Sequence, residues 1–273
     1  MIGVIVAMFG SRKRVTLVTG ASAQIKIQTK IERISVKNPF KRLSKKLYAT
    51  SKGYTTEVRD ALDKLPELSA KLEYMKNNRQ YRVDQQKPEF LELLNRVNAL
   101  APKQVLEIGG RRGGSALLFS IAAGEQASIL SIDLDNSGSR IERLQRLCYD
   151  KDVIFWQGDS HLDETAQRLE QYLGDSKIDF LFIDGDHSYE GAKEDFFRYS
   201  RYVRAGGIIA LHDIQQDYKT RFDVQTNSWA GGVPQFWQEL KVSDLNTQDL
   251  ISDAFQDGYG IGVVNWTGVA DAE

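Results

Sequence analysis

The chain has 273 residues, a net charge of −1, 41% hydrophobic residues and 27% charged residues. These values are ordinary for a globular protein and argue against a disordered or membrane-spanning chain. Its length predicts one domain with an extension, or two small domains. Cys148 is the only cysteine, so neither a disulfide framework nor a cysteine metal cluster is expected, and a reducing cytoplasm is the expected location.

The charge is distributed unevenly along the chain. Residues 1–53 contain twelve lysines and arginines but a single acid, Glu32, which gives this segment a charge of +11 and the remainder −12. Such a segment is typical of an arm that docks on an anionic membrane, a nucleic acid or an acidic partner. A solvated face lying on the chain's own acidic body is the open alternative. Membrane docking would make the cytoplasmic protein peripheral to a membrane.

The first elements are strands, expected within residues 15–36, where polar and apolar residues alternate in places. The stretch Val18–Ser22 resembles the start of a short-chain dehydrogenase. Gln24 and Lys26 stand where that family needs further glycines, so this dinucleotide-binding class is rejected.

Helices follow the basic segment. Apolar residues recur at helical spacing over residues 55–76, and Pro66 is expected to divide this helix in two. Pro88 is typical of the first turn of the next helix, which should end at Ala101 and Pro102. We expect these helices to cover a sheet. The predicted domains are residues 1–84, a basic extension with helices, and residues 85–273, the main domain.

A glycine-rich turn at residues 104–116 is the feature around which the chain is organised. An apolar strand ends at Ile108, four glycines follow, and a helix begins near Gly113 or Ser115. Glycines let the backbone approach a ligand, and the free N–H groups of the helix start face the same crevice. Arg111 replaces the middle glycine of a dinucleotide fingerprint, so a turn without a ligand stays an open alternative.

After this turn, strands and helices alternate. This pattern predicts an α/β fold with a parallel, doubly wound sheet, in which ligands bind beyond the carboxyl ends of the strands. The expected strands are residues 127–132, 153–156, 178–183 and 207–211, and the expected helices are residues 141–147, 162–173 and 189–203.

The only three histidines, His161, His187 and His212, each follow the carboxyl end of a predicted strand. Carboxylates and imidazoles without thiols suit a hard or borderline divalent cation. The accompanying acids at these strand ends are Asp133, Asp159, Asp184, Asp186 and Asp213.

Four motifs together resemble class I S-adenosylmethionine-dependent methyltransferases. They are Val-Leu-Glu-Ile-Gly with a following Gly-Gly-Ser, the acid Asp133, Gly-Asp-Ser at residues 158–160, and Phe-Ile-Asp-Gly-Asp-His-Ser-Tyr-Glu-Gly at residues 182–191. Two later motifs, which start at Arg204 and Gly232, resemble the branch of cephalosporin-hydroxylase-like proteins and macrolide sugar O-methyltransferases. The resemblance covers roughly residues 85–265 and implies a Rossmann-like, mostly parallel sheet of seven strands.

The resemblance also implies where S-adenosylmethionine binds. Asp133 would accept hydrogen bonds from the two ribose hydroxyls, with Asp135 as the competing candidate. Gly158, Asp159 and Ser160 would lie against the adenine. The residues expected at the methionine end of the pocket and at the helix start are Glu107, Gly109, Gly113 and Ser115.

Some relatives in this branch depend on magnesium. The resemblance to them implies that Asp184, His212 and Asp213 are the metal ligands in this chain. His212 stands where a carboxylate or amide is usual, and an imidazole shifts the preference towards transition metals. His187, three residues beyond Asp184, is the expected general base.

The sequence therefore predicts a methyltransferase that acts, with a divalent cation, on a hydroxyl of a small molecule or sugar. A metal-independent enzyme that uses His187 alone is one alternative, and a cofactor-binding module with a basic interaction arm is another. Trp237, Phe236 and Tyr189 either wall the acceptor pocket or belong to the core. A homo-oligomer is expected.

Overall fold

The computed structural model describes residues 5–9, 12–16, 54–124, 126–135, 138–148 and 152–268. The chain divides into two compact units, residues 1–37 and residues 38–273. In the first unit, β1 (Ile5–Phe9) pairs with β2 (Arg12–Thr16) as an antiparallel hairpin. Most of the basic segment, residues 17–53, and the strands expected over residues 17–36 lie outside the described residues, as do the residues of the rejected dehydrogenase motif.

The second unit is built on a sheet of seven strands in the order β5-β4-β3-β6-β7-β9-β8. The first five strands in this order are parallel, and the last two, β9 and β8, run antiparallel to their neighbours. The expected doubly wound fold is confirmed. The strands are β3 (Gln104–Ile108), β4 (Ser128–Asp133), β5 (Asp152–Gln157), β6 (Ile178–Ile183), β7 (Val203–His212), β8 (Asn246–Leu250) and β9 (Ile261–Trp266).

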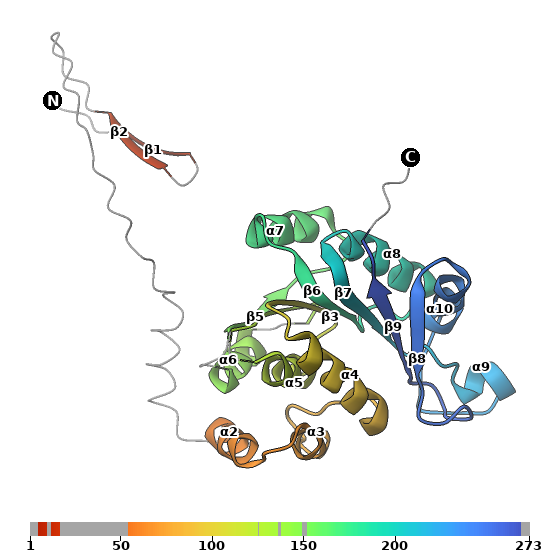
Figure 1. The fold of residues 1–273 in the computed structure, drawn as a ribbon. Coiled ribbons are helices and arrows are strands. Elements are labelled where there is room, and N and C mark those ends of the chain that lie inside the picture. Colours follow the sequence, from red (N-terminus) through yellow and green to blue (C-terminus); the bar gives the residue numbers. More distant parts are fainter. Residues whose placement is uncertain are drawn as a thin grey trace, which may run out of the picture. The chain divides into compact units, whose positions relative to one another are not determined.

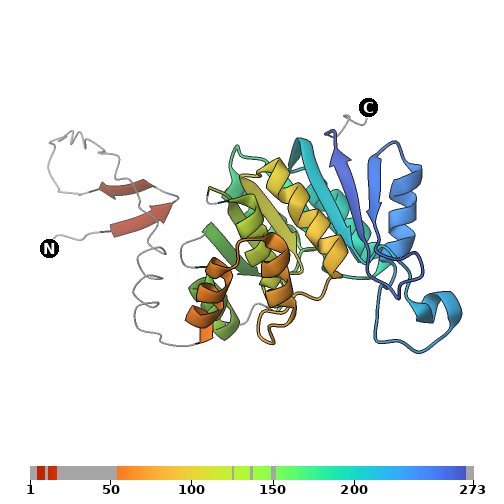
Figure 2. The same ribbon diagram turned by 60° about the horizontal axis from the view of Figure 1, so that its bottom comes forward.

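Helices cover both faces of this sheet (Figures 1 and 2). One face carries α2 (Tyr54–Lys64), α3 (Leu68–Lys76), α4 (Lys87–Leu100), α5 (Gly114–Ala123) and α6 (Gly138–Leu147). The opposite face carries α7 (Asp163–Leu173), α8 (Tyr189–Ser200) and α10 (Val233–Val242). The short helix α9 (Tyr218–Phe222) follows β7.

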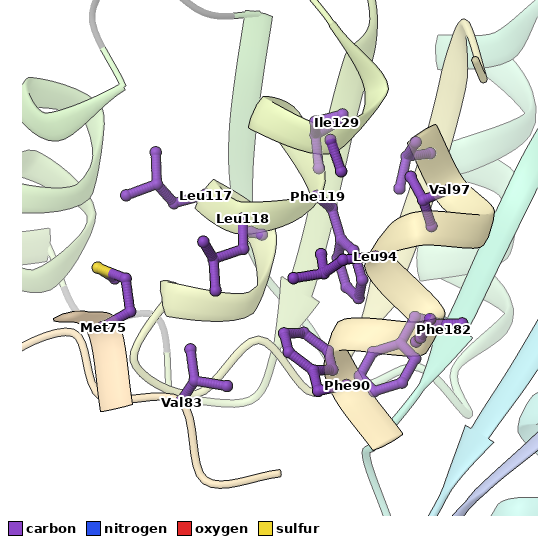
Figure 3. Close-up of a cluster of buried hydrophobic side chains, with 14 of the residues drawn as sticks. Met75, Val83, Phe90, Leu94, Val97, Leu117, Leu118, Phe119, Ile129 and Phe182 are labelled. Carbon is purple, nitrogen blue, oxygen red and sulfur yellow. The ribbon is translucent and has the colours of Figure 1, made fainter. Parts of the chain in front are cut away.

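The helices before the sheet form as their sequence predicts. Pro66 lies between α2 and α3, and Pro88 lies in the first turn of α4. Ala101 caps α4 with a left-handed backbone, φ 47°, and Pro102 follows it. Met75 and Val83 pack with α4 and α5, so residues on both sides of the predicted domain boundary at residue 84 share one core (Figure 3).

Aromatic rings fill the centre of this face. The Phe119 ring lies 5.4 Å from Phe90, 5.1 Å from Phe180 and 5.2 Å from Phe182. These rings join α4 and α5 to the middle strand β6 (Figure 3). Burial of each phenylalanine contributes roughly 2 to 3 kcal/mol to folding stability, so these rings hold α5 firmly against the sheet. The β3–α5 turn, which leads into this helix, is thereby fixed in position.

One element ends earlier than its pattern predicts. Helix α8 ends at Ser200, because Val203 already belongs to β7 and pairs with Ile178. Among the described residues, no helix is both long enough and apolar enough to cross a membrane.

Candidate active site

The carboxyl ends of β3 to β7 meet at one edge of the sheet, and the predicted site residues gather there. At β3, Gly109 has a left-handed backbone, φ 87°, and a Cβ on it would lie 1.9 Å from the Asp184 carbonyl oxygen. Gly113 begins α5 with φ 75°, and a Cβ there would collide with Leu144. The protein's own packing therefore requires Gly109, because the loops after β3 and β6 cross in contact there, and the Leu144 side chain of α6 fills the space beside Gly113.

Glu107 is fully buried beneath this turn. Its carboxylate accepts a 2.5 Å hydrogen bond from the Ser131 hydroxyl and interacts with the Ser115 side chain. Burial raises the pKa of Glu107 to about 7, although the two serine hydroxyls partly oppose the shift. Ser115 thus faces Glu107, and both support the turn from inside.

Asp133 ends β4 beside the glycine turn. Its carboxylate accepts hydrogen bonds from the backbone N–H of Arg111 at 2.6 Å and of Asp135 at 2.8 Å. These two bonds fix the carboxylate at the mouth of the β3–α5 turn, and a carboxylate has spare lone pairs for further donors. Asp135, the competing candidate for the ribose, is more exposed.

The loop after β5 holds Gly158, Asp159 and Ser160 at the same edge. The Asp159 carboxylate accepts from the His161 backbone N–H at 2.9 Å, and the Ser160 carbonyl accepts from the Tyr199 hydroxyl at 2.6 Å. All three predicted adenine contacts are half-buried.

The ends of β6 and β7 bring Asp184, His212 and Asp213 together, and we call this group the acid cluster. Each residue has a possible ligand atom within 4.8 Å of the others' atoms. His212 Nδ1 lies 3.1 Å from Asp184 Oδ1 and 3.1 Å from Asp213 Oδ2. Asp213 holds a left-handed backbone, φ 62°, which turns the chain after β7. The three residues that the family resemblance implied as ligands therefore lie together at one edge of the sheet.

The charges of the acid cluster depend on one another. Burial alone would raise the pKa of Asp184, but the charge of His212 and the hydrogen bonds from His187 and His212 lower it well below the usual range. Burial would lower the pKa of His212, yet Asp213 and Asp184 raise it well above 6.5. Without a metal ion, a proton on His212 compensates the two carboxylates.

His187 lies beside the acid cluster. Its Nε2 is 3.6 Å from Asp184 Oδ1, and its Nδ1 is 3.4 Å from Asp213 Oδ2. Nδ1 also lies 2.9 Å from the Trp229 carbonyl oxygen. The imidazole of His187 stacks on the indole of Trp229, with 5.1 Å between the ring centroids. Burial would lower the pKa of His187, but the two aspartates raise it to about 9.

Several residues of this edge were missed in the sequence. Gln85, before α4, donates from Nε2 to Asp184 Oδ2 at 2.6 Å. Trp229 is 69% exposed and lines a pocket of about 630 Å³ together with polar residues of the segment 217–231. No sequence pattern distinguishes Gln85 as a site residue. Trp229 could have been recognised, because a tryptophan among small polar residues indicates an exposed ring in a binding segment.

Of the two interpretations left open for the three aromatic residues, a pocket wall or the core, the core holds for two of them. Trp237 is 0% and Phe236 1% exposed, so both belong to the core beneath α10. Trp237 also donates from its ring nitrogen to Asp249 at 2.8 Å. Tyr189 is half-buried and donates from its hydroxyl to Glu239. The amphipathic spacing of α10 explains the two buried rings.

Comparisons with known proteins agree with this architecture. Residues 106–214 match the family described as "Methyltransferase domain". The O-methyltransferase of Bacillus cereus, solved with SAH, has a TM-score of 0.51 at 18% identity, with 83% of this chain and 98% of that chain covered. The O-methyltransferase TomG of Streptomyces achromogenes, solved with SAM, has a TM-score of 0.52 at 16% identity, with 85% and 99% covered.

Two curated relatives are more similar in sequence but longer. The uncharacterized protein R132 of Acanthamoeba polyphaga mimivirus is 29% identical over 42% of this chain. The uncharacterized protein y4gI of Sinorhizobium fredii (strain NBRC 101917 / NGR234) is 25% identical over 62% of this chain. The matched regions span 52% and 18% of these relatives.

The order and direction of the strands are shared with these O-methyltransferase structures. Residues 106–214 match the methyltransferase domain, and the sheet with its covering helices has the fold of the class I methyltransferases. The resemblance stated from the sequence is confirmed at this level.

Proposed function

We propose that the enzyme transfers the methyl group of S-adenosylmethionine to a hydroxyl of a small polar acceptor, with help from a divalent cation. The acid cluster carries this proposal, because two carboxylates and one imidazole converge at the ligand-binding edge of the sheet. The glycine turn, Asp133 and the loop of residues 158–160 would hold the cofactor beside it.

The donor set of the acid cluster fits a cation. His212 Nδ1 faces both carboxylates, while its Nε2 is buried and has no hydrogen-bond partner among the described residues. A bound cation would lower the pKa of the acceptor hydroxyl and orient it. Two oxygen ligands favour magnesium, and the imidazole shifts the preference towards manganese, iron or zinc.

His187 is the candidate base, and the Trp229 carbonyl supports this role. A carbonyl oxygen only accepts, so this contact places the ring proton on Nδ1 and leaves Nε2 as the basic atom of the neutral ring. The raised pKa of His187 comes from Asp184 and Asp213. Positive charge at the acid cluster would therefore lower the pKa of His187 and release the base.

The pocket beside Trp229 is the proposed acceptor site. Trp229 connects it to His187 by stacking, and Gly231 passes so close that a Cβ would lie 2.1 Å from the His187 carbonyl oxygen. One exposed indole among hydroxyl, amide and charged groups suits a polyhydroxylated ring such as a sugar. The polar lining residues are Asp217, Lys219, Thr220, Asp223, Gln225, Thr226 and Ser228.

The decisive experiment is methyl transfer to a panel of hydroxylated acceptors, with and without a chelator. We expect chelation to abolish activity and added Mg²⁺ or Mn²⁺ to restore it. Asp184→Asn should lose activity that excess metal partly restores, because the defect lies in metal affinity. Asp186→Asn is the matched control and should keep its activity. Asp186 accepts hydrogen bonds from the Ser188 N–H and hydroxyl in the same turn, but it lies outside the acid cluster. Chelator-insensitive transfer would contradict the role of the cation and favour the metal-independent alternative.

A further inference from the structure

Helix α8 contains a carboxylate that the proposed methyl transfer does not use. Asp195 is 0% exposed, and its Oδ1 lies 3.3 Å from His161 Nε2. Burial raises the pKa of Asp195 to about 6, although the Ser160 side chain and the charge of His161 oppose the shift. A buried carboxylate costs folding free energy unless it is paired, so an apolar residue would be more favourable for packing alone.

His161 connects Asp195 to the loop after β5. Its backbone N–H donates to the Asp159 carboxylate, and its Nε2 also lies 3.3 Å from the Gly191 carbonyl of α8. One turn after Asp195, the Tyr199 hydroxyl donates to the Ser160 carbonyl at 2.6 Å. Helix α8 therefore contacts two consecutive residues of this loop, Ser160 through its backbone carbonyl and His161 through its imidazole ring.

Asp195 also lies against the turn that follows β6. A Cβ on Gly185 would be 3.2 Å from Asp195 Oδ2, so the carboxylate packs under the residue that follows Asp184. Helix α8 itself begins where this turn ends, with Ser188 as its N-cap. Asp195 thus occupies the junction between the loop of residues 158–161 and the acid cluster.

We propose that Asp195 is a positioning residue for the cofactor, which acts through His161. The pair holds Gly158, Asp159 and Ser160 in the conformation that receives the adenine, while Asp195 itself contacts no reactant. This inference rests on the proposed binding of S-adenosylmethionine, with its adenine against that loop. It predicts that the charge of Asp195 controls cofactor affinity and adenine selectivity, whereas acceptor binding depends on the other side of the site.

The test uses the full-length protein and the variant Asp195→Asn, which keeps the side-chain volume and removes the charge. Calorimetry would measure the affinity for S-adenosylhomocysteine and for its analogue with hypoxanthine in place of adenine. We expect S-adenosylhomocysteine to bind roughly ten- to a hundredfold more weakly, and the preference for adenine to fall. The KM for the acceptor at saturating cofactor should not change. Glu194→Gln, which removes a neighbouring exposed charge of α8, is the control and should behave like the wild type.

The outcomes separate this inference from the proposed function. A wild-type protein that binds no S-adenosylhomocysteine would contradict the function itself. A wild-type protein that binds it, with Asp195→Asn unchanged in affinity and in adenine preference, would overturn the inference alone. If Asp195→Asn does not fold, as circular dichroism would show, Tyr199→Phe removes only the bond to the Ser160 carbonyl. Tyr199→Phe should lower the adenine preference by a smaller factor, and an unchanged preference would then overturn the inference.

Discussion

The two halves of the candidate site differ in the chemical groups that form them. The half proposed to bind the cofactor, which we call the cofactor half, lies at the ends of β3, β4 and β5. It consists mainly of glycines and backbone groups in tight contact, with Asp133 held by two backbone N–H groups. The half proposed to bind a cation, which we call the cation half, lies at the ends of β6 and β7 and consists of ionisable side chains. The pKa values of Asp184, His187 and His212 are displaced by their neighbours. Backbone packing dominates the first half and ionisable side chains dominate the second. Substitutions in the first half should therefore change cofactor affinity, whereas substitutions in the second should change the rate, the metal affinity or the KM for the acceptor.

The largest effect is expected in the cation half. His187→Ala should bind the cofactor normally and lose roughly 10² to 10⁴ in rate, the usual contribution of a positioned general base. Raising the pH should recover part of the loss, because an ionised acceptor needs no base. Single-turnover rates across pH, with metal affinity measured in parallel, check this. If the variant lost metal affinity but kept its rate at saturating metal, His187 would be a ligand.

In the cofactor half, Asp133→Ala should weaken S-adenosylhomocysteine binding by about 1.5 to 3 kcal/mol, the range for hydrogen bonds to a charged group. Asp133→Asn keeps an acceptor for the Arg111 N–H and should lose less. Calorimetry measures both variants. An affinity that is unchanged in Asp133→Ala would move the ribose contact to Asp135, for which Asp135→Ala is the matching variant.

A third effect concerns stability in the cofactor half. The folded-state pKa of Glu107, about 7, lies above its unfolded value of 4.5, so its contribution to stability is complete below pH 4.5 and is lost as pH rises through 7. Glu107→Gln cannot ionise. Between pH 5 and 8, the wild type should lose on the order of 1 to 2 kcal/mol relative to this variant. Urea unfolding at both pH values measures this difference, and parallel pH profiles would contradict the raised pKa.

The smallest effect is expected at the rim of the cation half. Trp229→Ala should raise the KM for the acceptor roughly three- to tenfold through the loss of ring stacking, with little change in cofactor affinity. Phe222→Ala removes another exposed aromatic ring of the same segment and serves as the control. Steady-state kinetics with the best acceptor distinguish the two variants. Equal KM values in the wild type and in Trp229→Ala would place the acceptor elsewhere.

The same difference explains how much the sequence could predict. Apolar strands that end in acids or histidines predicted the parallel sheet and the edge where these side chains gather. The family resemblance then selected Asp184, His212 and Asp213 among them, and the structure places these three together. The contacts of Gln85 and Asp195 could not be predicted, because they depend on how α4 and α8 pack against the sheet. The roles of Trp237 and Trp229 also needed the structure, since periodicity does not say which indole is covered.

For the glycines, the sequence indicated the right positions but not the whole reason. Gly109 and Gly113 were expected because a ligand needs room, while the structure shows that neighbouring protein atoms already occupy the space of a side chain. The interactions of the basic segment stay a prediction, because nearly all of its residues lie outside the described part of the chain.

The segment between β7 and α10 is closed at its base. Asp217 accepts hydrogen bonds from the backbone N–H groups of Thr220 and Ala230, and the Gly232 N–H donates to the His187 carbonyl at 2.7 Å. Residues 218–229 are therefore fixed at both ends, and within them Tyr218, Arg221 and Thr226 also bind residues 254–257. If the acceptor binds beside Trp229 as proposed, substitutions among the exposed residues of this segment should change the choice of acceptor and leave cofactor binding unaltered.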